Sequence, residues 1–446
     1  MKPHTIGEWK KIAFGAKSDP ISEGQADRLA KVARQSVFAG SSGEGVLEHR
    51  RKHLRARGVV GVIAATDCQL EILPKIEASG EHDAAPETLR RRLVHMLSVA
   101  RDLRIDAQNT ASLGWQRDTL LEILIRIFCN KMTEAVRHGI PRRYIAHTDD
   151  LPALRGRLNV TRQFSVLAAQ PQHLACEYDE LSPDIDLNRV MKAAISKLSR
   201  VATSADNLRS LRELSFAYAD ITDVAPSALR WDRITLDRTN DRWRELLSLA
   251  KLLLGDRHQT TNAGATDGHA LLFEMNVLFE EYVTKLLKRG LAGTPFTATS
   301  QGGQKDCLFE GEQGRFRTRP DIIIRHHGEV AMVIDTKWKR ISPRIEDAKQ
   351  GISQGDVYQL MAYSELYKCD RVMLLYPHHH GLPGSQPPQA YSIGSAGARK
   401  KLFVSTVDVS RRHSQVTTSL VHLVKTSLET SLSKPDNSAQ NSVYRR

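Results

Sequence analysis

The sequence predicts a C-terminal α/β domain with a mixed sheet flanked by helices, preceded by a small β-rich module and a mainly helical middle region. Short β-branched runs separated by polar turns fill residues 46–76. Apolar residues at helical spacing dominate residues 86–255. From residue 269 onward, helical and strand patterns alternate. With 446 residues, two or three domains are expected.

Composition narrows the class of protein. Lys and Arg number 64 against 51 Asp and Glu, and the resulting charge of +13 favours a polyanionic partner, although many basic proteins bind none. The five cysteines are scattered and form no C-x-x-C pair, so neither a disulfide framework nor a zinc site is expected. We find no signal-peptide core and no membrane-spanning run, which predicts a soluble, cytoplasmic protein without a membrane partner.

The N-terminal module is expected over residues 1–80. A capping-box pattern at Ser22 predicts a helix over 26–35, and strands are expected at 46–47, 59–64 and 70–76. Between them lies a basic run, residues 50–57, which includes Arg51 and Lys52. This run is interpreted either as a solvated loop or helix face or as a contact to DNA or to an acidic partner.

The middle domain is expected over residues 86–255. Helices are predicted at 88–102, 115–138, 188–203, 207–220 and 240–254. Arg155 and Arg157 flank Gly156 in a turn that is either salt-bridged or available to a phosphate or a partner protein. Four acids within residues 176–185 are interpreted as a loop that caps helices and pairs with arginines, with metal binding as the alternative.

Residues 256–268 are polar, small and without pattern, which predicts a linker. The α/β domain then occupies 269–410, and residues 411–446 are expected to form a helix over 416–432 and a disordered polar tail. Two helices are predicted inside the domain. The first, over 269–287, carries Glu280 and Glu281 near the edge of its apolar face, and the second, over 353–368, carries Gln359 and Tyr363 one turn apart.

The segment from Arg319 to Lys339 is the chemical centre of the sequence. Two β-branched runs flank a His-His-Gly break and predict a hairpin. Asp321 begins the first run, while Asp335 and Lys337 share one face at the end of the second and Thr336 points away. Two carboxylates and an ammonium in one pocket suit a divalent metal and the hydrolysis of a phosphodiester.

These residues resemble the motif of the PD-(D/E)xK nuclease superfamily. The match consists of Pro320-Asp321, then Asp335-Thr336-Lys337, then a helix with Gln359 and Tyr363. Asp321, Asp335 and Lys337 are alternatively interpreted as a buried salt bridge without catalytic function.

A longer stretch, roughly residues 58 to 364, resembles the McrC family, the nuclease subunits of McrBC modified-cytosine restriction systems. The matching segments are VGVI (60–63), LEILPKI (70–76), LRGRL (154–158), YDELSPD (178–184) with Asn188, FEMN (273–276), LFE (278–280), TRPD (318–321) and DTKWK (335–339). The resemblance implies a DNA endonuclease that cuts modified, methylated double-stranded DNA together with a McrB-like AAA+ GTPase hexamer. The chain itself carries no Walker-type phosphate loop.

The resemblance also implies residue roles. Asp321 and Asp335 would bind Mg²⁺, with Mn²⁺ as an alternative, and Glu280 or Glu281 would complete the site. Lys337 would orient or deprotonate the attacking water, and Gln359 would support the geometry. Because the N-terminal part of such subunits engages the hexamer, Arg51, Lys52, Arg155 and Arg157 are candidates for partner or DNA contact. A catalytically silent regulator of the GTPase and a stand-alone nuclease are the alternative functions.

Overall fold

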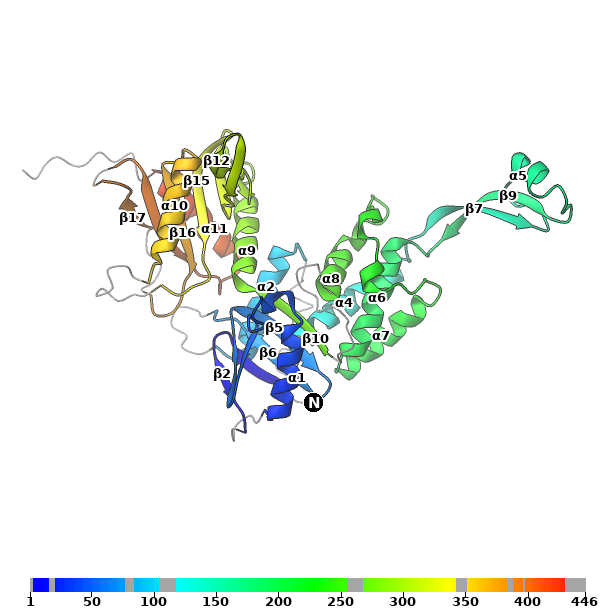
Figure 1. Ribbon diagram of the computed structural model, residues 1–446, viewed down its shortest axis with the longest axis horizontal. Helices are drawn as coiled ribbons and strands as arrows, with labels where there is room; N and C mark the ends of the chain where they lie inside the picture. Colours follow the sequence, from blue (N-terminus) through cyan, green and yellow to red (C-terminus); the bar gives the residue numbers. More distant parts are fainter. Residues whose placement is uncertain are drawn as a thin grey trace, which may run out of the picture.

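The structure is a computed structural model. It describes residues 3–15, 21–76, 84–103, 118–255, 268–341, 351–382, 388–395 and 398–429. The predicted linker except Gly268, the C-terminal tail, the first three residues of the predicted helix over 115–138 and the end of the predicted helix over 416–432 lie outside these residues. Figure 1 shows a β-rich N-terminal part beside a group of helices, an arm that projects from those helices, and an α/β unit on the opposite side.

The N-terminal part contains two sheets and one helix. The first sheet has the strand order β1-β6-β5-β10, with β1 parallel to β6 and the other pairs antiparallel, and the second has the order β2-β4-β3. The elements are β1 (His4–Gly7), β2 (Lys11–Ala13), α1 (Glu23–Arg34), β3 (Leu47–Arg50), β4 (His53–Ala56), β5 (Val59–Ala65) and β6 (Cys68–Leu73). The capping box at Ser22 is confirmed, because Ser22 and Gln25 exchange hydrogen bonds at the start of α1. The basic run 50–57, expected as a loop or helix face, is instead the turn and strand β4 of a hairpin.

Strand β10 (Gly268–Glu274) overturns one prediction. A helix was expected from residue 269, but helix α9 (Met275–Gly290) begins only after this strand. β10 pairs with β5 over its whole length, from Gly268 opposite Ala65 to Glu274 opposite Val59. Its apolar run can serve a helix or a strand, and the open edge of β5 decides between them. The segment after residue 268 therefore first completes the N-terminal sheet.

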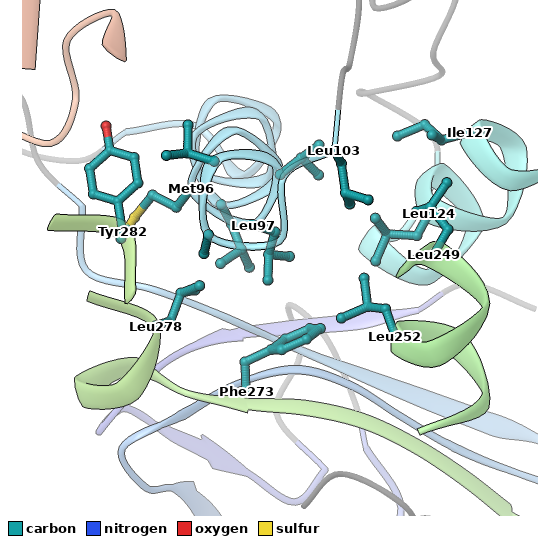
Figure 2. Packing of buried hydrophobic residues seen from close by; sticks show 14 of the residues in the cluster. Met96, Leu97, Leu103, Leu124, Ile127, Leu249, Leu252, Phe273, Leu278 and Tyr282 are labelled. Atoms are coloured by element: carbon teal, nitrogen blue, oxygen red, sulfur yellow. The ribbon is translucent and has the colours of Figure 1, made fainter. Parts of the chain in front are cut away.

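The middle region is built from helices around one apolar core. Its elements are α2 (Pro86–Ala100), α4 (Leu120–Arg137), α6 (Asp186–Val201), α7 (Ala205–Ala217) and α8 (Arg244–Leu254), with 3-10 turns at Pro226–Ala228, Trp231–Arg233 and Asp241–Trp243. Figure 2 shows Met96, Leu97, Leu124, Ile127, Leu249 and Leu252 of these helices converging with Phe273, Leu278 and Tyr282. Since the last three residues belong to β10 and α9, the core is continuous from the middle helices into the α/β unit.

An arm interrupts the helical region, and the sequence did not predict it. The arm contains β7 (Arg143–Leu151), β8 (Arg157–Leu158), the short helix α5 (Val160–Ser165) and β9 (Leu174–Ser182), in the order β7-β9-β8. Figure 1 shows it extending away from α6 and α7. Residues 176–185, expected as an acidic loop, lie mostly in β9. Glu177 faces Thr148 and Arg157 on neighbouring strands, so cross-strand pairing explains the local acidity.

The C-terminal unit has a mixed sheet in the order β11-β14-β15-β16-β18-β17. Its strands are β11 (Phe296–Ser300), β14 (Ile322–His326), β15 (Glu329–Thr336), β16 (Arg371–Pro377), β17 (Gln389–Ser392) and β18 (Lys401–Val407), with a separate ribbon of β12 (Asp306–Glu310) and β13 (Gln313–Arg317). The pairs β15–β16 and β16–β18 are parallel. The helices are α9, α10 (Gln354–Leu366) and α11 (His413–Glu429). The predicted hairpin is confirmed as β14–β15, and the prediction of a mixed α/β fold is confirmed with it.

Candidate active site

The site is built at one end of the β14–β15 hairpin. Ile322 pairs with Ile334 in an antiparallel register, so the next residues outward, Asp321 and Asp335, lie opposite each other. The parallel neighbour β16 continues this edge, because the backbone N–H of Lys337 donates to the carbonyl of Leu375 at 2.9 Å. Apolar strands thus hold two acids and a lysine where the hairpin leaves the sheet.

Asp335 is the most buried of these acids, with 1% of its surface exposed. Lys337 Nζ lies 2.7 Å from Asp335 Oδ2. Apart from this ion pair, neither carboxylate oxygen accepts a hydrogen bond from any described residue. Burial, followed by the charge of Asp321, raises the pKa of Asp335 to about 6. Only Oδ2 faces a cation, and a buried carboxylate whose other oxygen, Oδ1, has no partner is costly unless a further cation binds it.

Asp321 is held by Thr336, which strand alternation placed on the face opposite Asp335 and Lys337. Thr336 donates to Asp321 Oδ2 both from its backbone N–H, at 2.7 Å, and from its hydroxyl, at 2.8 Å. Thr336 therefore belongs to the site, although its side chain does not join those of Asp335 and Lys337. These two bonds fix one oxygen of Asp321 and leave the other available.

Lys337 connects the hairpin to helix α10. Its ammonium lies 3.4 Å from Gln359 Oε1 and 3.9 Å from Asp356 Oδ1. Gln359 in turn donates to the Tyr363 hydroxyl at 2.8 Å, as the one-turn spacing predicted. Burial lowers the pKa of Lys337, but Asp335 and the other acids raise it by more, and the net shift is upward. The structure therefore keeps this lysine protonated.

The two glutamates of α9 point to different neighbours. Glu280 accepts a hydrogen bond from Gln301 Nε2 at 3.0 Å, and Gln301 also binds Arg319. Burial and the charge of Asp321 raise the pKa of Glu280 to about 7. Glu281 instead pairs with Arg101 beyond α2, at 3.4 Å. Of the two glutamates, Glu280 is therefore the one that interacts electrostatically with Asp321 of the site.

The donor set fits a hard divalent cation. Among the described residues, His, Cys, Asp and Glu side chains form no group of three or more that could hold a metal ion by themselves. Mg²⁺ does not require such a cage, because it is commonly bound by one or two carboxylates together with water and substrate phosphates. Asp335 Oδ1 and the oxygen of Asp321 that Thr336 does not bind provide those carboxylates.

Sequence reasoning missed three contributors to this site. Asp356 lies one helical turn before Gln359, and that spacing could have identified it. Thr336 was expected to point away from Asp335 and Lys337, and its bonds to Asp321 were not anticipated. Gln301 carries no local signal, because its contact with Glu280 joins a strand end to a helix 21 residues earlier.

The four basic contact candidates lie in two separate places. Arg155 and Arg157 lie on the arm, where Arg157 pairs with Glu177 at 2.6 Å and Arg155 stacks 4.0 Å from the Tyr178 ring. Arg51 and Lys52 occupy the exposed turn between β3 and β4. The structure therefore does not combine them into one surface.

A family comparison decides the identity of the chain. Residues 54–377 match the model of the family described as "McrBC 5-methylcytosine restriction system component". The chain belongs to this McrBC family. The predicted resemblance to McrC is thereby confirmed, and the hairpin site falls inside the matched McrBC region.

Individual McrBC proteins show the same relationship. The chain is 20% identical over 276 residues to the type IV methyl-directed restriction enzyme EcoKMcrBC of Escherichia coli (strain K12), covering 58% of this chain and 78% of that protein. It also resembles McrC bound to McrB AAA+ hexamers in a half-complex of the tetradecameric assembly from Thermococcus gammatolerans, with a TM-score of 0.69 and 22% identity over 95% of this chain and 100% of that one. The cryo-EM structure of the Thermococcus gammatolerans McrBC complex matches with a TM-score of 0.53 and 26% identity over 65% and 88%.

Across the part of this McrBC chain that the structure describes, every helix is too short or too polar to span a lipid bilayer.

Proposed function

We propose that this chain is the Mg²⁺-dependent DNA endonuclease subunit of a McrBC-type restriction system, with Mn²⁺ as an alternative metal. It cuts methylated double-stranded DNA together with a McrB-like AAA+ GTPase hexamer and stimulates that partner. The observation that carries the proposal is the buried carboxylate of Asp335, which is opposite Asp321, pairs with Lys337 through Oδ2 and leaves Oδ1 without a partner among the described residues.

The order of elements supports membership of the PD-(D/E)xK superfamily. Helix α9 carries an acid, an antiparallel hairpin follows with the Asp321 and Asp335-x-Lys337 set, and helix α10 and the parallel strand β16 come next. A buried salt bridge without catalytic function would explain Asp335 and Lys337. It does not explain why Asp321 is placed directly opposite Asp335, where the two charges repel.

Each residue has a role that follows from its contacts. Asp321 and Asp335 would hold the cation, and Glu280 would complete the site from α9. A bound Mg²⁺ supplies charge for the phosphate oxygens and lowers the pKa of a coordinated water. Lys337, which the acids keep protonated, donates hydrogen bonds to the water or the scissile phosphate and offsets negative charge there. Orienting the water therefore fits this lysine better than deprotonating it. Gln359 and Asp356 fix the direction of its ammonium.

The arm is the element that we assign to the hexameric partner. Its exposed apolar side chains are unusual for a free surface. They are Tyr144, Leu154, Val160, Phe164, Val166 and Leu181. Arg155 and Arg157 lie beside them and add cations to the same arm. The relative from Thermococcus gammatolerans, in which McrC is bound to McrB hexamers, supports this kind of assembly.

The test is cleavage of methylated plasmid DNA by the purified chain with a McrB-type partner, GTP and Mg²⁺. Asp335→Ala and Lys337→Ala should lower the cleavage rate by about 10²–10³-fold or more while partner binding persists. Lys288→Ala is the control, because it removes an exposed lysine of helix α9 that pairs with none of the described acids. Chelation by EDTA should stop cleavage, and Mg²⁺ should restore it.

Full cleavage by either Asp335→Ala or Lys337→Ala would refute the assignment. Stimulation of the GTPase without any cleavage by the wild type would favour the silent regulator instead. Cleavage without the partner would favour a stand-alone nuclease.

A further inference from the structure

The end of the catalytic hairpin is tied to the first residues of the chain through Trp338. The indole N–H of Trp338 donates to Glu8 Oε1 at 2.9 Å, across 330 residues of sequence. The backbone N–H of Trp338 donates to Asn276 Oδ1 at 3.1 Å, and its ring meets Phe279 edge-on with centroids 5.4 Å apart. One side chain therefore joins the end of β15 to helix α9 and to the N-terminal module.

Glu8 is held in a fixed position for this contact. It follows β1, and its backbone N–H donates to the carbonyl of Leu73 at 2.9 Å. Its Oε1 also accepts the backbone N–H of Lys75 at 2.9 Å, and 1% of the residue is exposed. The turn that presents Glu8 is closed by a bond from Lys10 N–H to Gly7, with Trp9 at a φ of +64°. Bulky residues rarely adopt that conformation, so the surrounding contacts must enforce this turn.

The location of Trp338 makes the contact relevant to catalysis. Strand β15 ends at Thr336, and Lys337 makes one further sheet-like bond to β16. Trp338 is the next residue, so its anchors define where the backbone of Lys337 runs after the strand. Phe279, the ring that Trp338 touches, immediately precedes Glu280. Small displacements of catalytic groups lower rates strongly, by as much as about 10²-fold for 1 Å.

We propose that Glu8 and Trp338 are a positioning pair that fixes Lys337 and Asp335. The geometry of the cutting site then depends on how the N-terminal module is seated against the α/β unit. This inference rests on the proposed function for the reaction that is measured, but the contact itself can be tested without that reaction.

The first experiment measures cleavage kinetics of the full chain with a McrB-type partner, GTP, Mg²⁺ and methylated plasmid DNA. Trp338→Phe removes the indole N–H but keeps an aromatic ring, and Glu8→Ala removes the acceptor. Each should lower kcat by about 10–100-fold while KM for DNA and partner affinity stay unchanged. The double variant should lose no more than the more damaged single variant, because both changes break the same contact. Glu8→Gln, which keeps an acceptor oxygen, should recover most of the rate.

The matched control is Glu48→Ala. Glu48 is also a buried glutamate of the N-terminal module, but it pairs with Arg57 at 2.7 Å and with Arg55, and not with the catalytic segment. A merely structural role for Glu8 predicts that Glu8→Ala and Glu48→Ala lower thermal stability and kcat in parallel. That result, or a wild-type kcat in Trp338→Phe, would overturn the positioning pair.

A second readout is independent of activity. In protein labelled with ¹⁵N-lysine, the amide signal of Lys337, assigned by its loss in Lys337→Arg, should shift in Glu8→Ala and in Trp338→Phe but not in Glu48→Ala. An unchanged Lys337 signal in both variants would refute the proposal even if the wild type cleaves DNA. If the Lys337 signal shifts in both variants but the wild type cleaves no DNA, the positioning pair stands and the proposed function is overturned instead.

Discussion

At the scale of single residues, the site carries more buried negative charge than its one lysine can balance. Asp335 and Glu280 both have raised pKa values, first because they are buried and then because Asp321 repels them. An acid that is harder to ionise in the folded protein than in the unfolded chain lowers stability when it is charged. The metal-free site is therefore expected to be destabilising, as functional sites often are.

This argument separates the two glutamates of α9. Glu280→Gln should lower the rate of DNA cleavage by about 10²-fold. The same change should leave the melting temperature of metal-free protein unchanged or higher at pH 8, because it removes a repelled charge and keeps the hydrogen bond with Gln301. Glu281→Gln should retain cleavage, because Glu281 pairs with Arg101 and not with the hairpin acids, and its melting temperature at pH 8 should also not fall, because burial raises the pKa of Glu281 despite that pair. Cleavage assays and thermal melts of both variants check this. If Glu281 faced the site, Glu281→Gln would lose cleavage and Glu280→Gln would retain it.

His269 makes a separate prediction about acid stability. It is 7% exposed in β10, and burial together with the charge of Lys197 lowers its pKa to about 3. The unfolded chain binds a proton near pH 6.5 while the folded protein stays neutral, so stability should fall as pH decreases below 6.5. The loss attributable to His269 should be about 2–3 kcal/mol between pH 6.5 and 4.5.

Urea unfolding at several pH values measures this loss. His269→Phe should flatten the pH dependence in that window, whereas the exposed His138→Phe should leave it as in the wild type. Equal slopes for the wild type and His269→Phe would show that His269 is not responsible.

Residue-level prediction from sequence succeeded where a local pattern carried the information. Asp321, Asp335 and Lys337 lie at the ends of one hairpin, and Gln359 and Tyr363 are one turn apart, so strand and helix periodicity places them. Gln301 and Glu8 could not be found in this way. Their contacts join segments that are distant in sequence, and such pairing depends on how whole elements pack.

At the scale of elements, β10 was the main error and β5 explains it. An apolar run before an amphipathic helix is naturally interpreted as the first turns of that helix, and only the unpaired edge of β5 makes it a strand. Strand β9 was missed for the opposite reason. Only Ala175 and Cys176 are buried in it, and the consecutive residues Asp179, Glu180 and Leu181 are exposed, so it lacks the apolar alternation by which strands are recognised.

Gly61 tests the β5–β10 pairing directly. It has a φ of +134°, and a Cβ there would lie 1.9 Å from the carbonyl oxygen of Leu271. Gly61→Ala should therefore force the strands apart and destabilise the protein by about 2–3 kcal/mol more than a backbone penalty alone. Gly139→Ala is the control that measures the backbone penalty alone, because Gly139 has a φ of +103° and no atom lies within 4 Å of the added Cβ. Denaturant unfolding of both variants measures the difference, and equal losses would contradict this role of Gly61.

At the scale of the whole molecule, the mixed α/β fold class and most helices were predictable, since each depends on patterns within about 20 residues. The boundaries between regions were less accessible. The apolar core runs from α2, α4 and α8 through β10 into α9, so the regions share one interior rather than meeting at a surface. The arm was unpredictable because it exposes apolar side chains such as Tyr144 and Phe164, which sequence patterns assign to cores.

The late arrival of β10 has a consequence for synthesis on the ribosome. The edge of β5 is complete at residue 65, but the strand that covers it ends at residue 274. At about 5–20 residues per second, roughly 200 intervening residues take on the order of 10–40 seconds to translate. For that time the growing chain presents an open, apolar strand edge, the kind of surface that joins neighbouring chains into aggregates. The nascent protein is therefore most in need of a chaperone between these two points, before any residue of the candidate site has been made.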